Sequence, residues 1–376
     1  MTILHITDCY LPRLGGIETQ VHALAQRQLA AGHRVEVLTA TPRGRHDLTD
    51  REVIDGVPLL RATADLPFEL PVHPRAGREV ARVLDAGRYD VVHAHVGVVS
   101  PFAWAALPVV LDRGIPLLIT VHCLWGYATP AFRLLEAVTR WARWPAVLSA
   151  VSDVAAEPLR RIAGPGVTVE VIPNGIDADR WRVDPLPRER DDVHLAAVMR
   201  LAPRKRPLPL LRILRRTREL VPSRVRLRAD IAGDGPQRAA MERYVRRHGL
   251  EWVHLRGRVS ADELRELYRR ADVYVAPTRL ESFGIAALEA RTAGLPVVAM
   301  AAAGIREFVS PPDEGLLADS DAGMAAALAR LAVDVPLRER IAAHNRAVTP
   351  GVTWPDVLRR CDAAYARAAS LARAAG

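Results

Sequence analysis

Short runs of β-branched and apolar residues alternate along the chain with longer segments in which apolar residues return at helical spacing. The first runs predict a strand at residues 3–7, a helix at 17–31 and a second strand at 35–39. Strands that alternate with helices favour a parallel sheet with helices on its faces. Further strands are predicted at residues 89–95, 116–120, 146–151, 169–172, 194–198, 228–232, 273–276 and 296–299.

The length of the chain predicts two α/β domains, because 376 residues exceed the usual size of a single core. A charged, proline-bearing segment at residues 184–192 separates two series of strands and helices, and we expect the hinge there. The predicted domains are therefore residues 1–183 and 184–350, with a final amphipathic helix at 351–376.

Composition narrows the cellular setting. No apolar run reaches the roughly 20 residues that span a bilayer, and the chain opens directly on a strand without a signal-like segment. Three widely spaced cysteines predict a reduced, cytoplasmic protein without a disulfide framework. The net charge of +9 comes from arginines interspersed with acids, which argues against nucleic acid as a partner but suits an anionic membrane leaflet.

The segment at residues 272–303 is the strongest candidate for a ligand site. Its first strand runs through a polar loop into a helix that Ser282 is expected to cap and Gly294 to end. The backbone N–H groups of Phe283, Gly284 and Ile285 would then be exposed at the helix N-terminus, where the helix dipole favours an anion. This arrangement predicts a phosphate site.

Two carboxylates flank that helix start, Glu281 before it and Glu289 about two turns into it. Carboxylates do not help an anion bind, but they accept hydrogen bonds from sugar hydroxyls. The pattern therefore suits a nucleotide sugar, which carries sugars on both sides of its phosphates. The alternative is that Glu289 is a solvated helix residue and Glu281 an ordinary loop acid.

Basic and imidazole side chains follow other strands. Lys205 is the only lysine of the chain, and with Arg200 it could neutralise a pyrophosphate at a strand end. His122 ends the strand at 116–120, while alternation places His93 and His95 on one side of their strand. Without a third ligand nearby in the sequence, a structural or acceptor-side role for this pair is favoured over a metal site.

The spacing of Glu281 and Glu289, with Ser282-Phe283-Gly284 between them, resembles the E-x7-E motif of the retaining glycosyltransferase family 4. That resemblance implies the GT-B fold, in which two Rossmann-like, doubly wound parallel-sheet domains face a cleft and the final helix packs back on the first domain. It also implies that the first Glu holds the donor sugar, the second holds the ribose, and the amides of Phe283, Gly284 and Ile285 hold the diphosphate.

Other family motifs occur in the same order along the chain. They imply a glycine loop with Gly15 and Gly16 against the donor, a histidine, His122, on the donor sugar or its phosphate, a domain exit at residues 173–177, and Arg200 and Lys205 on the diphosphate. The segment around Gly233 resembles G-x-G-P, and the one holding Arg258 and Val259 resembles the loop whose backbone reads the base. Assignments on the acceptor side are Tyr10, Glu18 and His95.

Two positions depart from the family pattern G-R-L-x-x-x-K-G. Met199 and Arg206 stand where glycines are expected, so the path of this loop is open from sequence. The resemblance implies a retaining, metal-independent transfer with no cofactor, a UDP-sugar donor, and a small-molecule or lipid-linked acceptor. Three tryptophans between residues 125 and 144, together with arginines, could form core, an acceptor-pocket wall or a peripheral contact at the inner face of the membrane.

Alternatives on the same fold remain open at the level of sequence. One is a sugar-nucleotide epimerase or a phosphorylase, although a phosphorylase needs a cofactor-binding lysine and the single lysine is already assigned. A second is a catalytically idle subunit that binds a nucleotide sugar, which only turnover would distinguish. The third is a basic membrane or nucleic-acid adaptor, in which substitutions in the basic surface would be the damaging ones.

Overall fold

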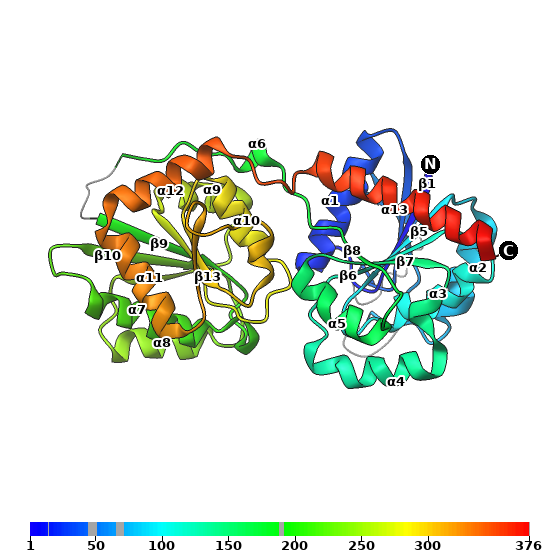
Figure 1. The fold of residues 1–376 in the computed structure, drawn as a ribbon, viewed down its shortest axis with the longest axis horizontal. Helices are drawn as coiled ribbons and strands as arrows, with labels where there is room; N and C mark the ends of the chain where they lie inside the picture. Colours follow the sequence, from blue (N-terminus) through cyan, green and yellow to red (C-terminus); the bar gives the residue numbers. More distant parts are fainter. Residues whose placement is uncertain (14, 44–50, 65–70, 188–191, 376) are drawn as a thin grey trace. The chain divides into compact units, whose positions relative to one another are not determined.

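The computed structural model describes residues 1–13, 15–43, 51–64, 71–187 and 192–375. The chain forms two compact units, one of residues 1–175 with 354–376 and the other of residues 176–353 (Figure 1). The boundary lies after the Pro173-Asn174-Gly175 turn, so the predicted division at residue 183 is too late, and the described part of the expected hinge belongs to unit 2. Residues 188–191 of that segment lie outside the described residues.

Unit 1 is built on an eight-stranded sheet in the order β3-β4-β2-β1-β5-β6-β7-β8. All of its neighbouring strands are parallel except the β3–β4 hairpin, which turns at Asp55-Gly56 and was not predicted. The strands are β1 (Thr2–Thr7), β2 (Arg34–Thr39), β3 (Arg51–Ile54), β4 (Val57–Arg61), β5 (Val91–Val96), β6 (Leu117–Val121), β7 (Ala146–Ala150) and β8 (Val169–Val171).

The helices of unit 1 follow the strands as the alternating pattern predicts. They are α1 (Gly16–Ala30), α2 (Ala76–Ala86), α3 (Pro101–Leu111), α4 (Thr129–Thr139) and α5 (Asp153–Ala163). Ser152 caps α5 as predicted, because its hydroxyl accepts the N–H of Ala155 at 3.0 Å. Asp8, just after β1, plays a similar part for α3, since its carboxylate accepts the N–H groups of Phe102 and Ala103.

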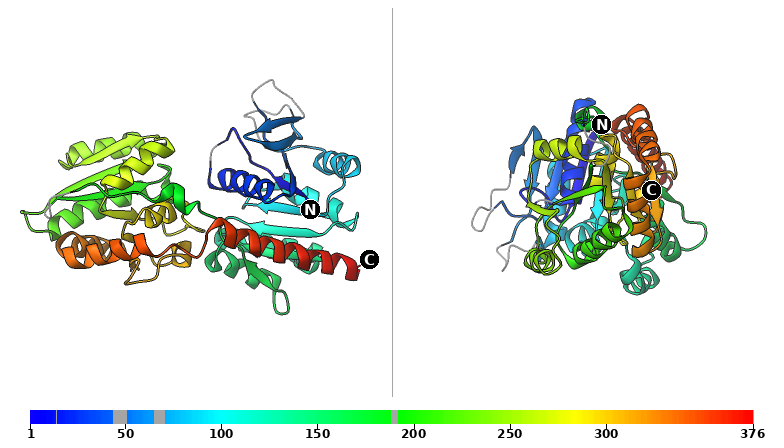
Figure 2. Two further views of the ribbon diagram at one scale, coloured as in Figure 1. Left: turned by 90° about the horizontal axis from the view of Figure 1, so that it is seen from above. Right: turned by 90° about the vertical axis from the view of Figure 1, so that its left-hand side faces the viewer.

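The last helix, α13 (Trp354–Ala375), crosses back from the end of unit 2 and completes unit 1. Trp354, Val357, Cys361 and Tyr365 are buried on one face at helical spacing and join the core formed with α1 and the central strands. Figure 2 shows this helix, in red, running along the unit 1 sheet. Its position explains why the chain crosses between the units twice.

Unit 2 has a six-stranded parallel sheet in the order β11-β10-β9-β12-β13-β14. In chain order this is the doubly wound pattern 3-2-1-4-5-6, whose direction reverses between β9 and β12. Ligands of such sheets bind beyond the carboxyl ends of the strands at this switch point. The strands are β9 (Asp192–Val198), β10 (Arg226–Ala232), β11 (Val253–Gly257), β12 (Val273–Ala276), β13 (Val297–Met300) and β14 (Gly315–Ala318).

Helices cover the unit 2 sheet, and one of its cores is formed by α7, α11 and the apolar side of the central strands. The helices are α6 (Ala178–Trp181), α7 (Pro207–Leu220), α8 (Arg238–Arg247), α9 (Ala261–Arg270), α10 (Ile285–Thr292), α11 (Asp321–Val333) and α12 (Val335–Ala347). Ser260 and Glu263 form a capping box at the start of α9.

Two further observations concern the surroundings of the chain. Among the described residues, no helix combines the length and the apolar character that a membrane crossing requires. Cys9, Cys123 and Cys361 are all free thiols.

The glycine after β10 supports a testable prediction about the unit 2 fold. Gly233 has φ +127°, and a Cβ there would lie 1.8 Å from the carbonyl oxygen of Met199. We expect Gly233→Ala to lower the free energy of unfolding by about 3 kcal/mol or more in urea denaturation, because it adds a backbone clash to an unfavourable φ. Gly249→Ala is the matched control.

Gly249 also has a positive φ, +59°, but a Cβ there would have no neighbouring atom within 4 Å. Its substitution should cost only the left-handed conformation, roughly 1–2 kcal/mol. Equal losses in the two variants would show that the loops after β9 and β10 can move apart to admit a Cβ at no cost.

Candidate active site

In unit 2, the turn after β9 and the loop after β12 meet at the switch point of the sheet. Lys205 lies in the short 3-10 turn Pro203–Lys205, and its Nζ donates to Glu281 Oε2 at 2.5 Å. Both side chains are largely buried, with 25% and 18% of their surface exposed. The hydroxyl of Thr278 donates to the backbone carbonyl of Lys205, which ties the two loops a second time. The solitary lysine is therefore held beside the first carboxylate of the predicted motif.

Arg206 explains one departure from the family pattern. Its backbone is left-handed, with φ +61°, which is the conformation that glycine adopts most easily. Its guanidinium donates to the carbonyl of Pro277 and to both carboxylate oxygens of Asp321 at 2.8–2.9 Å. These bonds offset the free-energy cost of the left-handed backbone. The turn therefore keeps the conformation that glycine would give it, and the Arg206 side chain ties it to the loop after β12.

Met199 is the other residue that stands where the family pattern has glycine, and the fold accommodates it in a different way. Its side chain is buried in the unit 2 core, and its carbonyl faces the Cα of Gly233. Gly233, in the loop after β10, is thus the glycine that lets this loop approach the backbone of Met199 closely. Gly235 serves in the same way, because a Cβ there would lie 2.7 Å from the carbonyl oxygen of Leu201.

The helix α10 begins two residues later than predicted. Its N-cap is Gly284, at φ +95°, and not Ser282. The side chain of Phe283 turns into the core against Phe308, with ring centroids 5.3 Å apart. Gly304 closes the loop from the other side, since its N–H donates to the carbonyl of Glu281 at 2.8 Å. The contact between Gly304, in the loop after β13, and Glu281 therefore sets where the helix starts. The helix propensity of the local residues does not include such a contact.

Glu289 lies in the middle of α10 and is mostly removed from solvent. Burial raises the pKa of its carboxyl to about 8, against a smaller opposing effect of Arg180. A carboxyl of this kind is costly to ionise in the free protein. Hydroxyl donors of a ligand would satisfy it, which fits the ribose-holding role that the resemblance implies.

The remaining predicted donor residues of unit 2 are at its surface. Arg200 is exposed just after β9, and Arg258 is 85% exposed with its Nε 3.8 Å from Asp234. Val259 is half-buried. Arg200 is thus near Lys205 in sequence, but the structure does not pair it with Glu281.

In unit 1, the loop after β1 leads into α1 as predicted. Gly15 is the N-cap of α1 and Gly16 its first residue, and the Glu18 side chain folds back over Gly15. Tyr10, however, is fully buried in the core, and its hydroxyl lies 2.7 Å from Nδ1 of His22. The side chain therefore serves packing, which corrects its assignment to the acceptor side.

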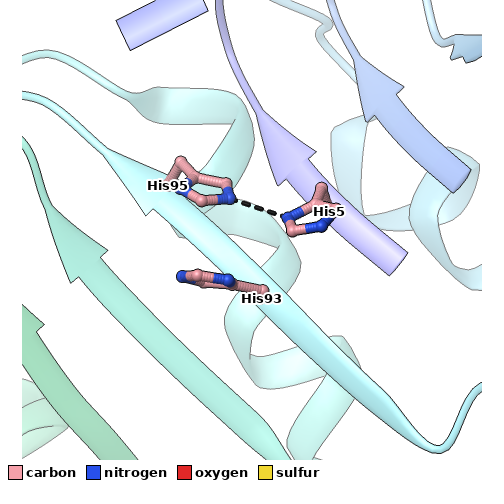
Figure 3. A group of neighbouring side chains, drawn as sticks. All are labelled: His5, His93 and His95. Atoms are coloured by element: carbon pink, nitrogen blue, oxygen red, sulfur yellow. Dashed lines mark hydrogen bonds between the residues drawn. The ribbon is translucent and has the colours of Figure 1, made fainter. Parts of the chain in front are cut away.

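The predicted pairing of His93 and His95 is confirmed, with ring centroids 4.1 Å apart on β5. His95 also contacts His122, since its Nδ1 lies 2.9 Å from His122 Nε2. A third imidazole that the sequence reasoning missed, His5 on β1, lies beside them, with its Nδ1 2.9 Å from His95 Nε2 (Figure 3). The expectation that no third histidine is near was wrong.

Nitrogens of His5, His93 and His95 lie within 4.8 Å of one another, a spacing that a metal ion could use. All six ring nitrogens of this group nevertheless have a hydrogen-bond partner, either another imidazole or one of Gln28, Thr120 and Tyr365. Burial lowers the pKa of His5 to about 4 and those of His93 and His95 well below the usual value. The arrangement is satisfied as a network of neutral rings.

His5, Gln28 and Tyr365 could not be found by motif. His5 and His93 are in register on adjacent parallel strands, which becomes visible only once β1 and β5 are paired. Tyr365 arrives from α13, 272 residues further along the chain than His93. The one local signal was Gln28, a polar residue on the buried side of a helix.

The tryptophan-rich segment forms core. Trp125 and Trp141 are each 1% exposed, and Trp125 stacks on Phe132 with centroids 3.7 Å apart. The outer face of α4 is different, because Leu134 and Val138 are 69% and 76% exposed. The predicted aromatic stripe is therefore buried, and an aliphatic pair takes its place at the surface.

Two doubly wound α/β units, each with polar side chains gathered at the carboxyl ends of its central strands, define the two-domain architecture of GT-B transferases. Models of known families match both halves: Glycosyltransferase Family 4 at residues 14–180 and Glycosyl transferases group 1 at residues 179–348. Glycogen synthase of Mycobacterium tuberculosis is 30% identical over 95% of this chain and 92% of the relative. The chain belongs to glycosyltransferase family 4 and is a glycosyltransferase.

Other comparisons agree with this assignment. The gpi3 subunit of phosphatidylinositol N-acetylglucosaminyltransferase of Schizosaccharomyces pombe is 26% identical over 84% of this chain and 71% of its own length. The Anabaena protein HepE in complex with UDP-glucose superposes with a TM-score of 0.74 at 20% identity, covering 97% of this chain and 99% of HepE. This likeness supports the GT-B fold.

The buried carboxyl of Glu289 predicts a specific pH dependence of stability. Its pKa in the folded protein, about 8, lies above the ordinary value of 4.5, so the native state binds an extra proton between these values. Stability must then fall as pH rises from about 5 to 8. We expect Glu289→Gln, which mimics the neutral acid, to reduce this fall when urea midpoints are measured across that range.

The comparison removes the contributions of groups common to both proteins, including the carboxyl of Asp8, whose pKa burial raises to about 6. Glu251→Gln, at an exposed position of unit 2, is the control and should leave the pH profile unchanged. Parallel profiles for wild type and Glu289→Gln would mean that Glu289 is ionised at neutral pH in the free protein.

Proposed function

We propose that this glycosyltransferase moves a hexose or N-acetylhexosamine from a nucleotide diphosphate sugar to an acceptor hydroxyl, with retention of anomeric configuration. The observation that carries the proposal is the pairing of Lys205 with Glu281 at the switch point, next to the N-terminus of α10. A cation, a carboxylate and free helix N–H groups in one place suit a diphosphate with a sugar attached.

In this proposal the diphosphate binds between Lys205 and the amides at the start of α10. It then competes with Glu281 for the ammonium group and frees that carboxylate to accept sugar hydroxyls. Arg200, exposed and adjacent to the turn, adds positive charge to the outer phosphate. Glu289 accepts the ribose hydroxyls. The donor thus replaces the ion pair of the free protein with contacts to its own groups.

The transfer step breaks the bond between the anomeric carbon and the phosphate oxygen and forms one to the acceptor oxygen on the same face. The leaving phosphate takes the acceptor proton, and Lys205 with the helix N–H groups stabilises the charge that develops on it. These groups supply the electrostatic stabilisation by themselves, so we propose a metal-independent reaction. His122 is assigned the donor-sugar contact implied by the family motif.

A uridine nucleotide is the preferred donor in this proposal, since structures of the Anabaena protein HepE contain UDP, glucose and UDP-glucose. The acceptor is proposed to be a small molecule or a lipid-linked group, in keeping with the phosphatidylinositol-directed name of the fission yeast relative. The proposed location is the cytoplasm.

Substituting Lys205 tests the donor site. We expect Lys205→Ala to weaken UDP binding by about 1–3 kcal/mol in calorimetry without added metal, because a charge-assisted bond to the diphosphate is lost. Turnover of the preferred UDP-sugar should fall by about 100-fold or more, because the same charge stabilises the leaving group. The donor is first chosen by a thermal-shift screen of UDP, GDP and their sugar conjugates.

Arg204→Ala is the matched control, since Arg204 precedes Lys205 in the same turn and is exposed. It removes the same formal charge and should leave binding within about 0.5 kcal/mol of wild type. Equal effects of the two substitutions would point to a diffuse basic surface, as in an adaptor. Intact binding without any turnover would identify an idle nucleotide-sugar-binding subunit, and an inverted product would disprove retention.

Peripheral membrane contact is a second proposal, supported by the outer face of α4. The exposed Leu134 and Val138 lie one helical turn apart, and Arg133, Arg140 and Arg143 are exposed in the same segment. Apolar side chains flanked by arginines fit the headgroup region of an anionic bilayer.

This surface predicts binding to vesicles that contain anionic phospholipid. The double variant Leu134→Ser/Val138→Ser should reduce the fraction that cofloats with them by about 10-fold, because two apolar side chains no longer enter the bilayer. Leu371→Ser, at another exposed leucine of unit 1, is the control. Absence of cofloatation by the wild-type protein, or equal loss in the control, would remove membrane contact from the proposal.

A further inference from the structure

Three of four buried imidazoles form a hydrogen-bonded chain through the unit 1 sheet. His5 on β1 contacts His95 on β5, and His95 contacts His122 just after β6, with nitrogens 2.9 Å apart at each step. His93, on the same face of β5, lies alongside (Figure 3). His93, His95 and His122 also line a cavity of ≈ 20 Å³, about the space of one water molecule.

A single amide joins the two branches of this network. Gln28 on α1 places its Oε1 2.7 Å from His5 Nε2, and its Nε2 donates to the hydroxyl of Tyr365 at 2.9 Å. From Tyr365 a second branch runs through His93 and Thr120 to Ser149, with steps of 3.0, 2.7 and 2.7 Å. Gln28 is 0% exposed, so water does not compete for its amide.

The chemistry of neutral imidazole makes the chain directional. A neutral ring has one N–H donor and one acceptor nitrogen, so each ring that accepts on one side must donate on the other. Burial keeps these rings neutral, since it lowers the pKa values of His5 and His122 to about 4. The tautomer of His122 is therefore linked to that of His5 through His95.

The rings and hydroxyls of the network can donate in two opposite directions, and the amide of Gln28 decides between them. With its oxygen toward His5, the three rings of the chain all donate from Nε2, and Tyr365 donates to His93. Thr120 then donates to Ser149, which leaves the Ser149 hydroxyl free to donate to the carbonyl of Ile119 at 3.3 Å. With the amide reversed, Ser149 must donate to Thr120 and that last bond is lost.

We propose that Gln28, acting through His5 and His95, holds His122 in the Nε2–H tautomer, so that His122 presents the lone pair of Nδ1 as a hydrogen-bond acceptor. Gln28, His5 and His95 are positioning residues in this inference. Its consequence for catalysis rests on the proposed function, in which His122 contacts the donor sugar: an acceptor nitrogen selects a hydroxyl of the sugar and disfavours the anionic oxygens of the diphosphate.

The chain also explains why these groups are buried in a sheet that could have been apolar. A lone histidine at a strand end would exchange between tautomers, and part of its population would present the wrong group to a ligand. An amide cannot exchange its donor and acceptor ends without rotating, and a rotated Gln28 amide would reverse its bonds to His5 and Tyr365 and cost the bond from Ser149 to Ile119. Fixing the orientation of the Gln28 amide therefore fixes the tautomer of His122.

The test reads the tautomers directly, by long-range ¹H–¹⁵N correlation spectra of protein labelled at histidine, with signals assigned by single substitutions. We expect His5, His95 and His122 of the wild type to be Nε2–H tautomers. Gln28→Leu should shift His122 to a mixture of tautomers and lower kcat for sugar transfer by about 10- to 100-fold, with little change in KM. Gln28→Glu, which keeps an acceptor for His5, should restore the tautomer.

Thr39→Val is the control for lost stability, because it removes two buried hydrogen bonds of the same sheet outside the network, one donated to the carbonyl of Asp8 and one accepted from the N–H of Thr41. It should leave the tautomers and kcat unchanged. An Nδ1–H tautomer of His122 in the wild type, or an unchanged tautomer in Gln28→Leu, would overturn the inference. Stoichiometric zinc on the purified protein with metal-shifted signals of His5, His93 and His95 would overturn it as well.

The spectra need no substrate, so the inference and the proposed function fail separately. Nε2–H tautomers that respond to Gln28, in a protein without transfer activity, would retain the network and remove the proposed reaction. Active enzyme with an unresponsive His122 would retain the reaction and remove the network.

Discussion

The proposed donor site of unit 2 depends on one constraint, the attachment of the turn after β9 to the loop after β12. Arg206 clamps Pro277 and Asp321, and Lys205 bonds Glu281, so two loops from either side of the switch point become one surface. The left-handed backbone of Arg206 would by itself destabilise the turn. It persists because the guanidinium is anchored at three points, which shows how a position that normally takes glycine can take a charged residue.

In both units a doubly wound sheet brings polar side chains together near its central strands, but the chemistry of these side chains differs. In unit 2 the loops after β9 and β12 bring Lys205 and Glu281 together next to the N-terminus of α10, a combination that suits an anion with a sugar attached. In unit 1 the strands β1, β5 and β6 bring together neutral imidazoles whose charge is suppressed by burial. The polar groups of unit 2 are thus charged side chains held in place by ion pairs. Those of unit 1 are neutral rings held in place by hydrogen bonds.

Sequence reasoning located the elements well where the pattern is local. The strand β12 begins and ends at the predicted residues, β9 and β13 shift by one or two, and the cap at Ser152 is as expected. It failed where packing between loops decides. The start of α10 moved from Ser282 to Gly284 because Gly304 closes on that loop, and Tyr10 turned inward because His22 offers its hydroxyl a buried partner.

The sequence by itself determined the α/β class, the order of the motifs, the family resemblance and the candidate residues of the donor site, because each is written in short stretches with fixed spacing. Only the tertiary structure decided which distant residues share a site. His5, Gln28 and Tyr365 meet because β1 pairs with β5 and α13 returns to unit 1. The domain boundary at Gly175 falls within the exit at residues 173–177 that the family resemblance implies, but only the tertiary structure shows that Trp354 packs against that glycine.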